Sequence, residues 1–251
     1  MREPADLSDL ARELTGMKII HPGGFAISEA MITFAGAKLD GEWLDTSCCS
    51  GESLAHLAAT FPAHLTGIDI STAHVGRARQ RLKEAGLRAD VEIADATALP
   101  FAASSFDLVY SECTASLFDK ARCLPEWQRV LRPGGAVAIH DIYWIEAPEP
   151  TLREAERTRL GGDPFTRDEW LAALEQAGFT DIEVVDRTED LQRLRAEVSQ
   201  QVQPEELSRV FFESIRRHGW RRAGLFYFLY LWLGEPPGRL GYLLIRGQRP
   251  S

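Results

Sequence analysis

The sequence predicts an α/β protein whose largely parallel, doubly wound sheet is covered by helices on both faces. Three observations support this fold class. Short apolar runs alternate with helical patterns over residues 43–140, the first three runs each end at or just before an aspartate, and the loop after the first run contains only small residues. Repeated strand–helix–strand units predict a parallel sheet, because parallel neighbours need a crossover connection.

Length and composition limit the classes of protein that fit. The chain has 251 residues, 45% of them hydrophobic, which is enough for one full globular core. A net charge of −9 argues against a nucleic-acid partner or an anionic membrane surface. The first residues are charged rather than an apolar leader, and the aromatic stretch 223–234 is too short to cross a bilayer. We expect a soluble, cytoplasmic protein with no integral membrane segment.

Cysteine usage agrees with a reduced compartment. The four cysteines, at positions 48, 49, 113 and 123, show neither a disulfide framework nor a C-x-x-C pair. Cys123 lies on a helix, and we expect it to pack in the protein interior as a small hydrophobic residue. We expect no metal site.

The N-terminal half is expected to begin with a helical segment over residues 1–40. Its two amphipathic stretches, 5–15 and 25–37, are separated by the turn His21-Pro22-Gly23-Gly24. Strands are predicted at 43–46, 64–70, 90–94, 106–110 and 136–140, and helices at 51–60, 72–85 and 119–131. Ser71 is placed to cap the second of these helices. The row Arg77, Arg79, Arg81 and Lys83 on that helix is interpreted as a solvated face.

The C-terminal half departs from the simple alternation. Arg132-Pro133-Gly134-Gly135 is predicted to be a turn that stops the preceding helix, and residues 146–163 are read as a connector with a short helix. Thr166 and Glu169 form the pattern of a capping box. Further strands are expected at 181–186 and 241–246.

A helical cap or lid is predicted between these last two strands, over residues 188–235. Its aromatic residues are expected in the core or at a homodimer contact rather than in a substrate pocket. The core would then comprise residues 41–187 and 236–251.

A loop of small residues follows the first strand. The pattern Asp45-x-Ser47-x-Cys49-x-Gly51 is a degraded form of a glycine-rich D-x-G-x-G-x-G loop. Small side chains there let a ligand approach the backbone amides and the N-terminus of the next helix. A plain tight turn before a core helix is the alternative interpretation.

Carboxylates follow three successive strands and are expected at one edge of the sheet. Asp69, about twenty residues after the small-residue loop, is placed to accept hydrogen bonds from a ribose. Asp45 could hold a cationic amino group, and Asp95 with the amide of Ala96 could reach the amine of an adenine. The alternative is that each aspartate caps the turn that follows it.

These segments together resemble the class I S-adenosylmethionine-dependent methyltransferases, in the small-molecule branch that includes ubiquinone-biosynthesis and arsenite methyltransferases. Residues 44–51 look like the first motif of that family and 66–71 look like the second, while 94–109 and 129–135 match later motifs. The resemblance implies a Rossmann-like sheet of seven strands with the last one antiparallel, and methyl transfer to a small molecule with S-adenosylmethionine as cofactor and S-adenosylhomocysteine as product. The cofactor-binding residues it implies are Asp45, Ser47, Cys49, Gly51, Asp69, Ile70, Asp95, Ala96 and Ser111.

One departure from the family pattern concerns the cofactor loop. Ser47 and Cys49 replace two motif glycines, so a position that needs a positive φ would be strained. A catalytically weak or non-catalytic binding protein with the same fold is therefore an alternative. A dinucleotide oxidoreductase is disfavoured, because Asp95 and the turn at 131–135 would have no role in it.

Candidate residues for the substrate side lie on the loops after the fourth and fifth strands. They are Glu112, Cys113, Asp141 and Tyr143, joined by His21 from the N-terminal segment, although His21 also suits a turn and His140 a strand end. In arsenite methyltransferases the loop matching Cys113 holds a metalloid-binding cysteine. The later partner cysteine of that family is absent here, which argues against metalloid chemistry.

Overall fold

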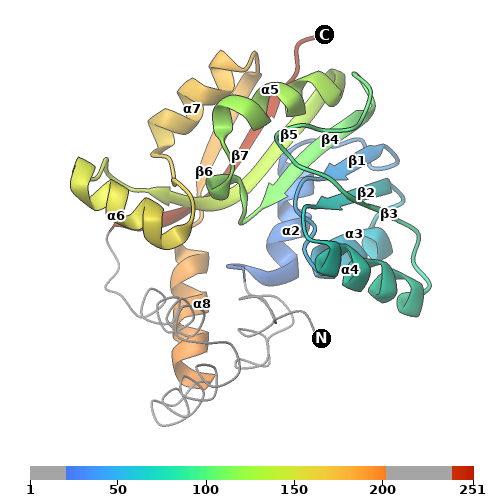
Figure 1. The fold of residues 1–251 in the computed structure, drawn as a ribbon, viewed down its shortest axis with the longest axis horizontal. Coiled ribbons are helices and arrows are strands. Elements are labelled where there is room, and N and C mark those ends of the chain that lie inside the picture. The colour runs from blue at the N-terminus through green and yellow to red at the C-terminus, as the bar shows by residue number, and fades with distance from the viewer. Residues whose placement is uncertain (1–20, 202–238) are drawn as a thin grey trace.

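A seven-stranded sheet forms the centre of the computed structural model, which describes residues 21–201 and 239–251 (Figure 1). The strand order is β3-β2-β1-β4-β5-β7-β6, and β7 is antiparallel to both β5 and β6. The other neighbouring strands are parallel. The strands are β1 (Glu42–Asp45), β2 (His64–Asp69), β3 (Asp90–Ile93), β4 (Phe106–Glu112), β5 (Leu131–Trp144), β6 (Thr180–Asp186) and β7 (Leu240–Gln248). The α/β, doubly wound sheet expected from the sequence is thus confirmed.

The described helices are α2 (Gly24–Phe34), α3 (Glu52–Thr60), α4 (Thr72–Ala85), the short 3-10 helix η1 (Ala115–Leu117), α5 (Lys120–Val130), α6 (Pro150–Leu160), α7 (Arg167–Gln176) and α8 (Thr188–Gln201). Side-chain caps begin three of them, α4, α5 and α7. The hydroxyl of Ser71 accepts a hydrogen bond from the amide of His74 and so caps α4. Thr166 and Glu169 form the predicted capping box at the start of α7.

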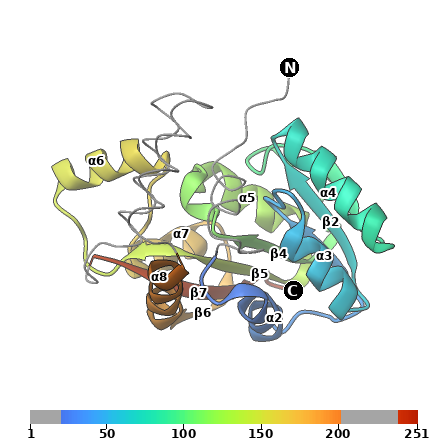
Figure 2. The same ribbon diagram turned by 90° about the horizontal axis from the view of Figure 1, so that it is seen from below.

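Two hydrophobic cores lie on the two faces of the sheet. Trp43 of β1 packs in the core formed with α2, α3 and α4, whereas its neighbour Leu44 packs in the core formed with α5 and α7. This division follows from the alternation of side chains along a strand. Figure 2 shows α5 and α7 on one side of β5 and β7, with α2 on the other.

The segment 132–135 is not a separate turn, and this prediction was wrong. Helix α5 does end at Val130, but β5 begins directly at Leu131 and is longer than the predicted 136–140. The C-terminal end of the chain pairs with this segment, since Gly134 N–H donates to the carbonyl of Arg249 at 2.9 Å and Arg249 N–H donates to that of Gly135 at 2.8 Å. A long-range pairing therefore extends the strand through residues that locally favour a turn.

The basic row on α4 is exposed at Arg79, Arg81 and Lys83 and half-buried at Arg77, and its arginines also bind neighbouring segments, which the sequence did not predict. Arg77 Nε donates to Ser50 Oγ at 3.0 Å, and Arg81 Nε donates to the carbonyl of the same serine at 2.9 Å. Arg79 donates from Nε and Nη2 to the carbonyl of Val91 in β3. Three arginines of α4 therefore fasten the loop after β1 and the strand β3.

Two predicted segments fall partly or wholly outside the described residues. The first N-terminal helix, 5–15, lies outside, and so does the cap beyond α8, whereas the second N-terminal helix is present as α2. The division into an N-terminal segment, a core and a cap stays a prediction. Within the described ranges, no helix combines the length and the apolar character that a bilayer crossing requires.

A pair of glycine variants tests the packing of α3 against α4. Gly51 precedes α3 with φ +78°, and a Cβ added there would lie 2.8 Å from Cβ of Ala78. Gly51→Ala should therefore lower the free energy of unfolding by about 1–3 kcal/mol. Gly76→Ala, inside α4 with open space around the added methyl group, should raise it by about 0.5–1 kcal/mol. Urea unfolding midpoints measure both, and equal effects would contradict this account.

Candidate active site

The ends of β1, β2 and β3 bring the three predicted aspartates to one edge of the sheet. Asp45 pairs in register with Gly67 of β2, and Asp69 pairs with Ile93 of β3. Asp95 follows β3 by two residues. The structure therefore gathers all three on neighbouring strands, as the sequence predicted.

All three aspartates also shape the turns that follow them. Each accepts a hydrogen bond from the backbone amide two positions later. The pairs are Asp45 with Ser47 at 3.1 Å, Asp69 with Ser71 at 2.8 Å, and Asp95 with Thr97 at 2.8 Å. The capping interpretation is thus correct for each residue, and it does not exclude ligand binding, because a carboxylate has further acceptor sites.

Asp45 is a buried carboxyl group without a cation. Its exposed fraction is 3%, and burial, followed by the charge of Glu112, raises its pKa to about 8. No lysine, arginine or histidine of residues 21–201 and 239–251 forms an ion pair with it. An ammonium group of a ligand would supply the missing positive charge, so this residue fits the amino-acid part of S-adenosylmethionine.

Asp69 ties the loop after β1 to the start of α4. Its Oδ2 accepts a hydrogen bond from Cys49 N–H at 3.1 Å, and its Oδ1 lies 3.2 Å from Nδ1 of His74. Part of its acceptor capacity is therefore used within the protein. The remaining lone pairs could accept from a ribose hydroxyl.

The backbone strain expected in the loop of small residues occurs at one of the two positions where another residue replaces a motif glycine. Cys49 has φ +47°, in the left-handed region that favours glycine, whereas Ser47 does not. The loop is held down by Cys48 N–H, which donates to the carbonyl of Ile68 at 2.8 Å. The backbone thus keeps the path of a glycine-rich loop at a local conformational cost.

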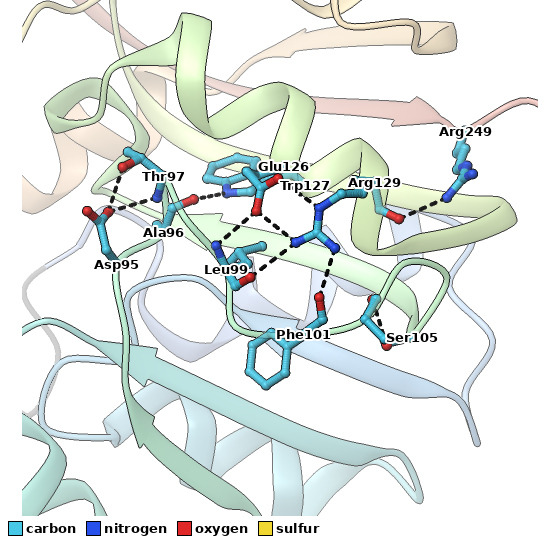
Figure 3. Close-up of polar contacts among 11 residues, drawn as sticks. Asp95, Ala96, Thr97, Leu99, Phe101, Ser105, Glu126, Trp127, Arg129 and Arg249 are labelled. Atoms are coloured by element: carbon cyan, nitrogen blue, oxygen red, sulfur yellow. Dashed lines mark hydrogen bonds and ion pairs between the residues drawn. The ribbon is translucent and has the colours of Figure 1, made fainter.

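A network on α5 positions the segment after β3 (Figure 3). Trp127 Nε1 donates to the carbonyl of Ala96 at 3.1 Å. Arg129 donates to the carbonyls of Leu99 and Phe101, while Glu126 accepts from Leu99 N–H at 3.0 Å. No local sequence signal predicted a role for these α5 side chains at the site. They fix the backbone on which Asp95 and Ala96 lie.

Two apolar side chains are exposed at the same edge. Ile70, directly after β2, is 75% exposed, and Ile93, at the end of β3, is 52% exposed. Exposed aliphatic side chains beside a polar loop can pack against the flat face of an adenine.

Glu112 and Cys113 lie at the end of β4 and face the N-terminal part of the chain. Glu112 Oε1 accepts from Ser28 Oγ at 2.7 Å and lies 3.9 Å from Nε2 of His21. The thiol of Cys113 contacts the hydroxyl of Tyr242 on β7, and burial raises its pKa well above the usual value. The structure therefore brings three of the predicted substrate-side residues together.

The other candidates are engaged in the fold. Asp141 accepts from both the amide and the hydroxyl of Ser116, and burial raises its pKa to about 6. The Tyr143 hydroxyl donates to Asp186 on β6. The hydroxyl of Ser111 lies 3.0 Å from that of the threonine three residues later. These contacts hold the segments in which the side chains lie, and their proposed site roles stay predictions.

His140 lies beside this group, a neighbourhood that the sequence analysis did not find. It is fully buried on β5, opposite Glu112 in the β4–β5 register. Its ring lies 5.9 Å from that of His21 and 4.4 Å from that of Tyr242, measured between centroids. Neither ring nitrogen has a hydrogen-bond partner among the residues described. Burial lowers its pKa well below the usual value, so the imidazole is neutral.

Comparisons with known proteins agree with this geometry. Residues 44–139 match a model of the methyltransferase domain family. Over 143 residues the chain is 35% identical to 27-O-demethylrifamycin SV methyltransferase of Amycolatopsis mediterranei, a match that covers 54% of this chain and about half, 53%, of that relative.

Two solved structures show the same fold. The [4+2]-cyclase SpnF superimposes with a TM-score of 0.82 at 21% identity, covering 98% of this chain and 93% of that one. Phosphoethanolamine N-methyltransferase 2 of Haemonchus contortus, in complex with S-adenosyl-L-methionine, superimposes with a TM-score of 0.78 at 20% identity, covering 100% of this chain and 59% of that one. The family match and the relative, together with the sheet order and the loop after β1, support a class I S-adenosylmethionine-dependent methyltransferase domain over residues 44–139, and the solved structures share its fold.

Proposed function

We propose that this chain transfers the methyl group of S-adenosylmethionine to a small-molecule acceptor. The observation that carries the proposal is the buried, cation-free carboxyl group of Asp45, next to the ribose candidate Asp69. The matched relative, named for methyl transfer to a rifamycin precursor, supports a small acceptor. The comparisons give no support to a non-catalytic binding protein, and the assignment to the ubiquinone and arsenite methyltransferase branch stays a prediction.

The proposed cofactor-binding site, the cofactor seat, uses groups from the three loops that follow β1, β2 and β3. Asp45 would hold the ammonium group, and backbone amides of the loop 46–51 would meet the amino-acid part. Asp69 would accept from the ribose, while Ile70 and the segment 95–96 would contact the adenine. The cofactor supplies a methyl group that is already activated as a sulfonium. The protein then mainly aligns the two reactants and excludes water.

The proposed acceptor side lies on the ends of β4 and β5. The carboxylate of Glu112 lies 3.9 Å from Nε2 of His21 there. A carboxylate or a neutral imidazole in this position can accept the proton of an acceptor hydroxyl, amine or thiol. The segment 188–235 is proposed as the cap over this side.

The role of Asp69 is tested by removing its carboxylate. Asp69→Ala should weaken S-adenosylhomocysteine binding by about 1–3 kcal/mol, because ribose hydroxyls lose their acceptor and the amide of Cys49 is released. Isothermal titration calorimetry measures the change, with Asp90→Ala at the exposed start of β3 as the matched control. Unchanged affinity in Asp69→Ala would remove this residue from the cofactor seat.

The raised pKa of Asp45 predicts a pH dependence of cofactor affinity. The free carboxyl group titrates at about 8, and an ammonium partner would lower its pKa, so binding releases a proton below that pH. The affinity should rise from about pH 6 to about pH 8, by at most roughly tenfold per pH unit. Calorimetry in buffers of different ionisation enthalpy measures the proton released. Asp45→Asn should abolish both effects, and a pH-dependent affinity that survives this substitution would refute the assignment.

The carboxyl group of Asp45 also makes the folding stability depend on pH. Stability should fall as pH rises, whereas cofactor affinity should rise. The folded pKa of this group lies above the ordinary value of 3.8, so the native state binds the extra proton between these limits. Its contribution to the free energy of unfolding is therefore fully present at acid pH and is lost as pH rises toward 8. The slope of stability against pH should be shallower in Asp45→Asn.

The loop strain is tested at Cys49. Cys49→Gly relieves the left-handed conformation at φ +47° and should raise the free energy of unfolding by about 1 kcal/mol. Cys49→Ala removes the thiol but keeps the Cβ, so it should give no such gain. Chemical denaturation compares the two variants, and an equal gain in both would locate the cost in the sulfur rather than in the backbone.

A further inference from the structure

Three metal-binding side chains converge outside the proposed cofactor seat. Ligand atoms of His21, Cys113 and His140 all lie within 4.8 Å of one another. They come from the turn before α2, the loop after β4 and the strand β5. A hydrogen bond of 2.7 Å from Cys113 N–H to the carbonyl of His140 fixes two of the three backbones together.

His140 provides an independent sign that a ligand is bound there. The side chain is 0% exposed, and neither ring nitrogen has a partner within the described ranges. A buried polar group left without a hydrogen bond costs about 1–3 kcal/mol. A neutral imidazole has one lone pair, which a metal ion can use directly.

We propose that His21, Cys113 and His140 bind a divalent transition-metal ion of the zinc class. Two imidazoles and one thiolate are the donors that such an ion prefers. Three protein ligands leave a fourth position open, as in catalytic rather than structural zinc sites. A hydroxyl or thiol of the acceptor would occupy that position, and this last step alone rests on the proposed methyl transfer.

The geometry needs only small movements of side chains. Tetrahedral coordination places nitrogen and sulfur ligands about 3.3–3.8 Å apart, so separations of up to 4.8 Å would contract by roughly 1 Å. The thiol must lose its proton, which a bound cation promotes. Glu112, at 3.9 Å from His21, and the Tyr242 hydroxyl, in contact with the thiol, are placed as outer partners of two ligands.

A second group of possible ligands serves as the internal comparison. Atoms of Cys49, Asp69 and His74 also lie within 4.8 Å of one another. The carboxylate of Asp69 already accepts hydrogen bonds from the amides of Cys49 and Ser71 and contacts His74. These contacts account for that group without a metal ion, whereas the ring nitrogens of His140 have no such partners.

The experiment uses Co²⁺ as a spectroscopic probe in the full chain. Metal-stripped protein is titrated with Co²⁺, and the near-ultraviolet charge-transfer band of a thiolate–cobalt bond is recorded. We expect a saturable band that equimolar Zn²⁺ removes. Cys113→Ser should abolish the band, and His140→Gln should weaken Co²⁺ binding at least about tenfold. Cys49→Ser, the matched control, should keep the band and the affinity.

The outcomes separate this inference from the proposed function. Circular dichroism checks that every variant folds, and S-adenosylhomocysteine calorimetry on the unaltered chain and on Cys113→Ser tests the cofactor seat by itself. Absence of the band in the unaltered chain, or a band that survives Cys113→Ser but is lost in Cys49→Ser, would overturn the metal site. Failure to bind S-adenosylhomocysteine while the Co²⁺ band is intact would instead overturn the methyltransferase proposal.

Discussion

The carboxylate of Asp69 holds together the two segments on which the cofactor seat depends. It accepts from Cys49 N–H in the loop after β1 and from Ser71 N–H at the start of α4. Because β1 and β2 are parallel neighbours, both segments leave the sheet at the same edge, and one side chain can reach both. The path of the loop therefore depends on a residue about one strand–helix unit further along the chain.

The arginines of α4 extend this constraint. Arg77 and Arg81 both donate hydrogen bonds to Ser50, one residue before Gly51, which precedes α3. The loop is thus fixed by β2 on one side and by α4 on the other. Such fixation lets a residue with a Cβ occupy a left-handed position, since the surroundings hold the backbone there in spite of the cost.

Three costly features lie at this edge of the sheet. Among the residues that the structure describes, Asp45 is buried without a cationic partner, the ring nitrogens of His140 are buried without a hydrogen-bond partner, and Cys49 has a positive φ. The capping box at Thr166, by contrast, follows the expected local pattern. Strained backbone conformations and unpaired buried polar groups are common where a protein binds a ligand or reacts. These three features therefore agree with a functional region at this edge.

The elements and their order could be predicted because their signals are local. Apolar periodicity and caps lie within a few residues of each boundary, and the aspartates after β1, β2 and β3 lie in sequence beside their strands. The extension of β5 could not be predicted in this way, since it needs the backbone of Arg249. Nor could the grouping of His140 with His21, which depends on the register of β4 with β5 and on the packing of the N-terminal segment.

That register also determines how the two halves of the site face each other. Asp45 pairs with Tyr110 and Glu112 pairs with His140, so alternation along the strands directs these side chains to the face covered by α2. The same fold can serve unrelated reactions, and its chemistry is decided by the side chains placed on it. Here the residues proposed for the amino-acid part of the cofactor and the histidine–cysteine group share one face and one edge. In the proposed reaction, the sheet register therefore sets the direction from which an acceptor meets the methyl group.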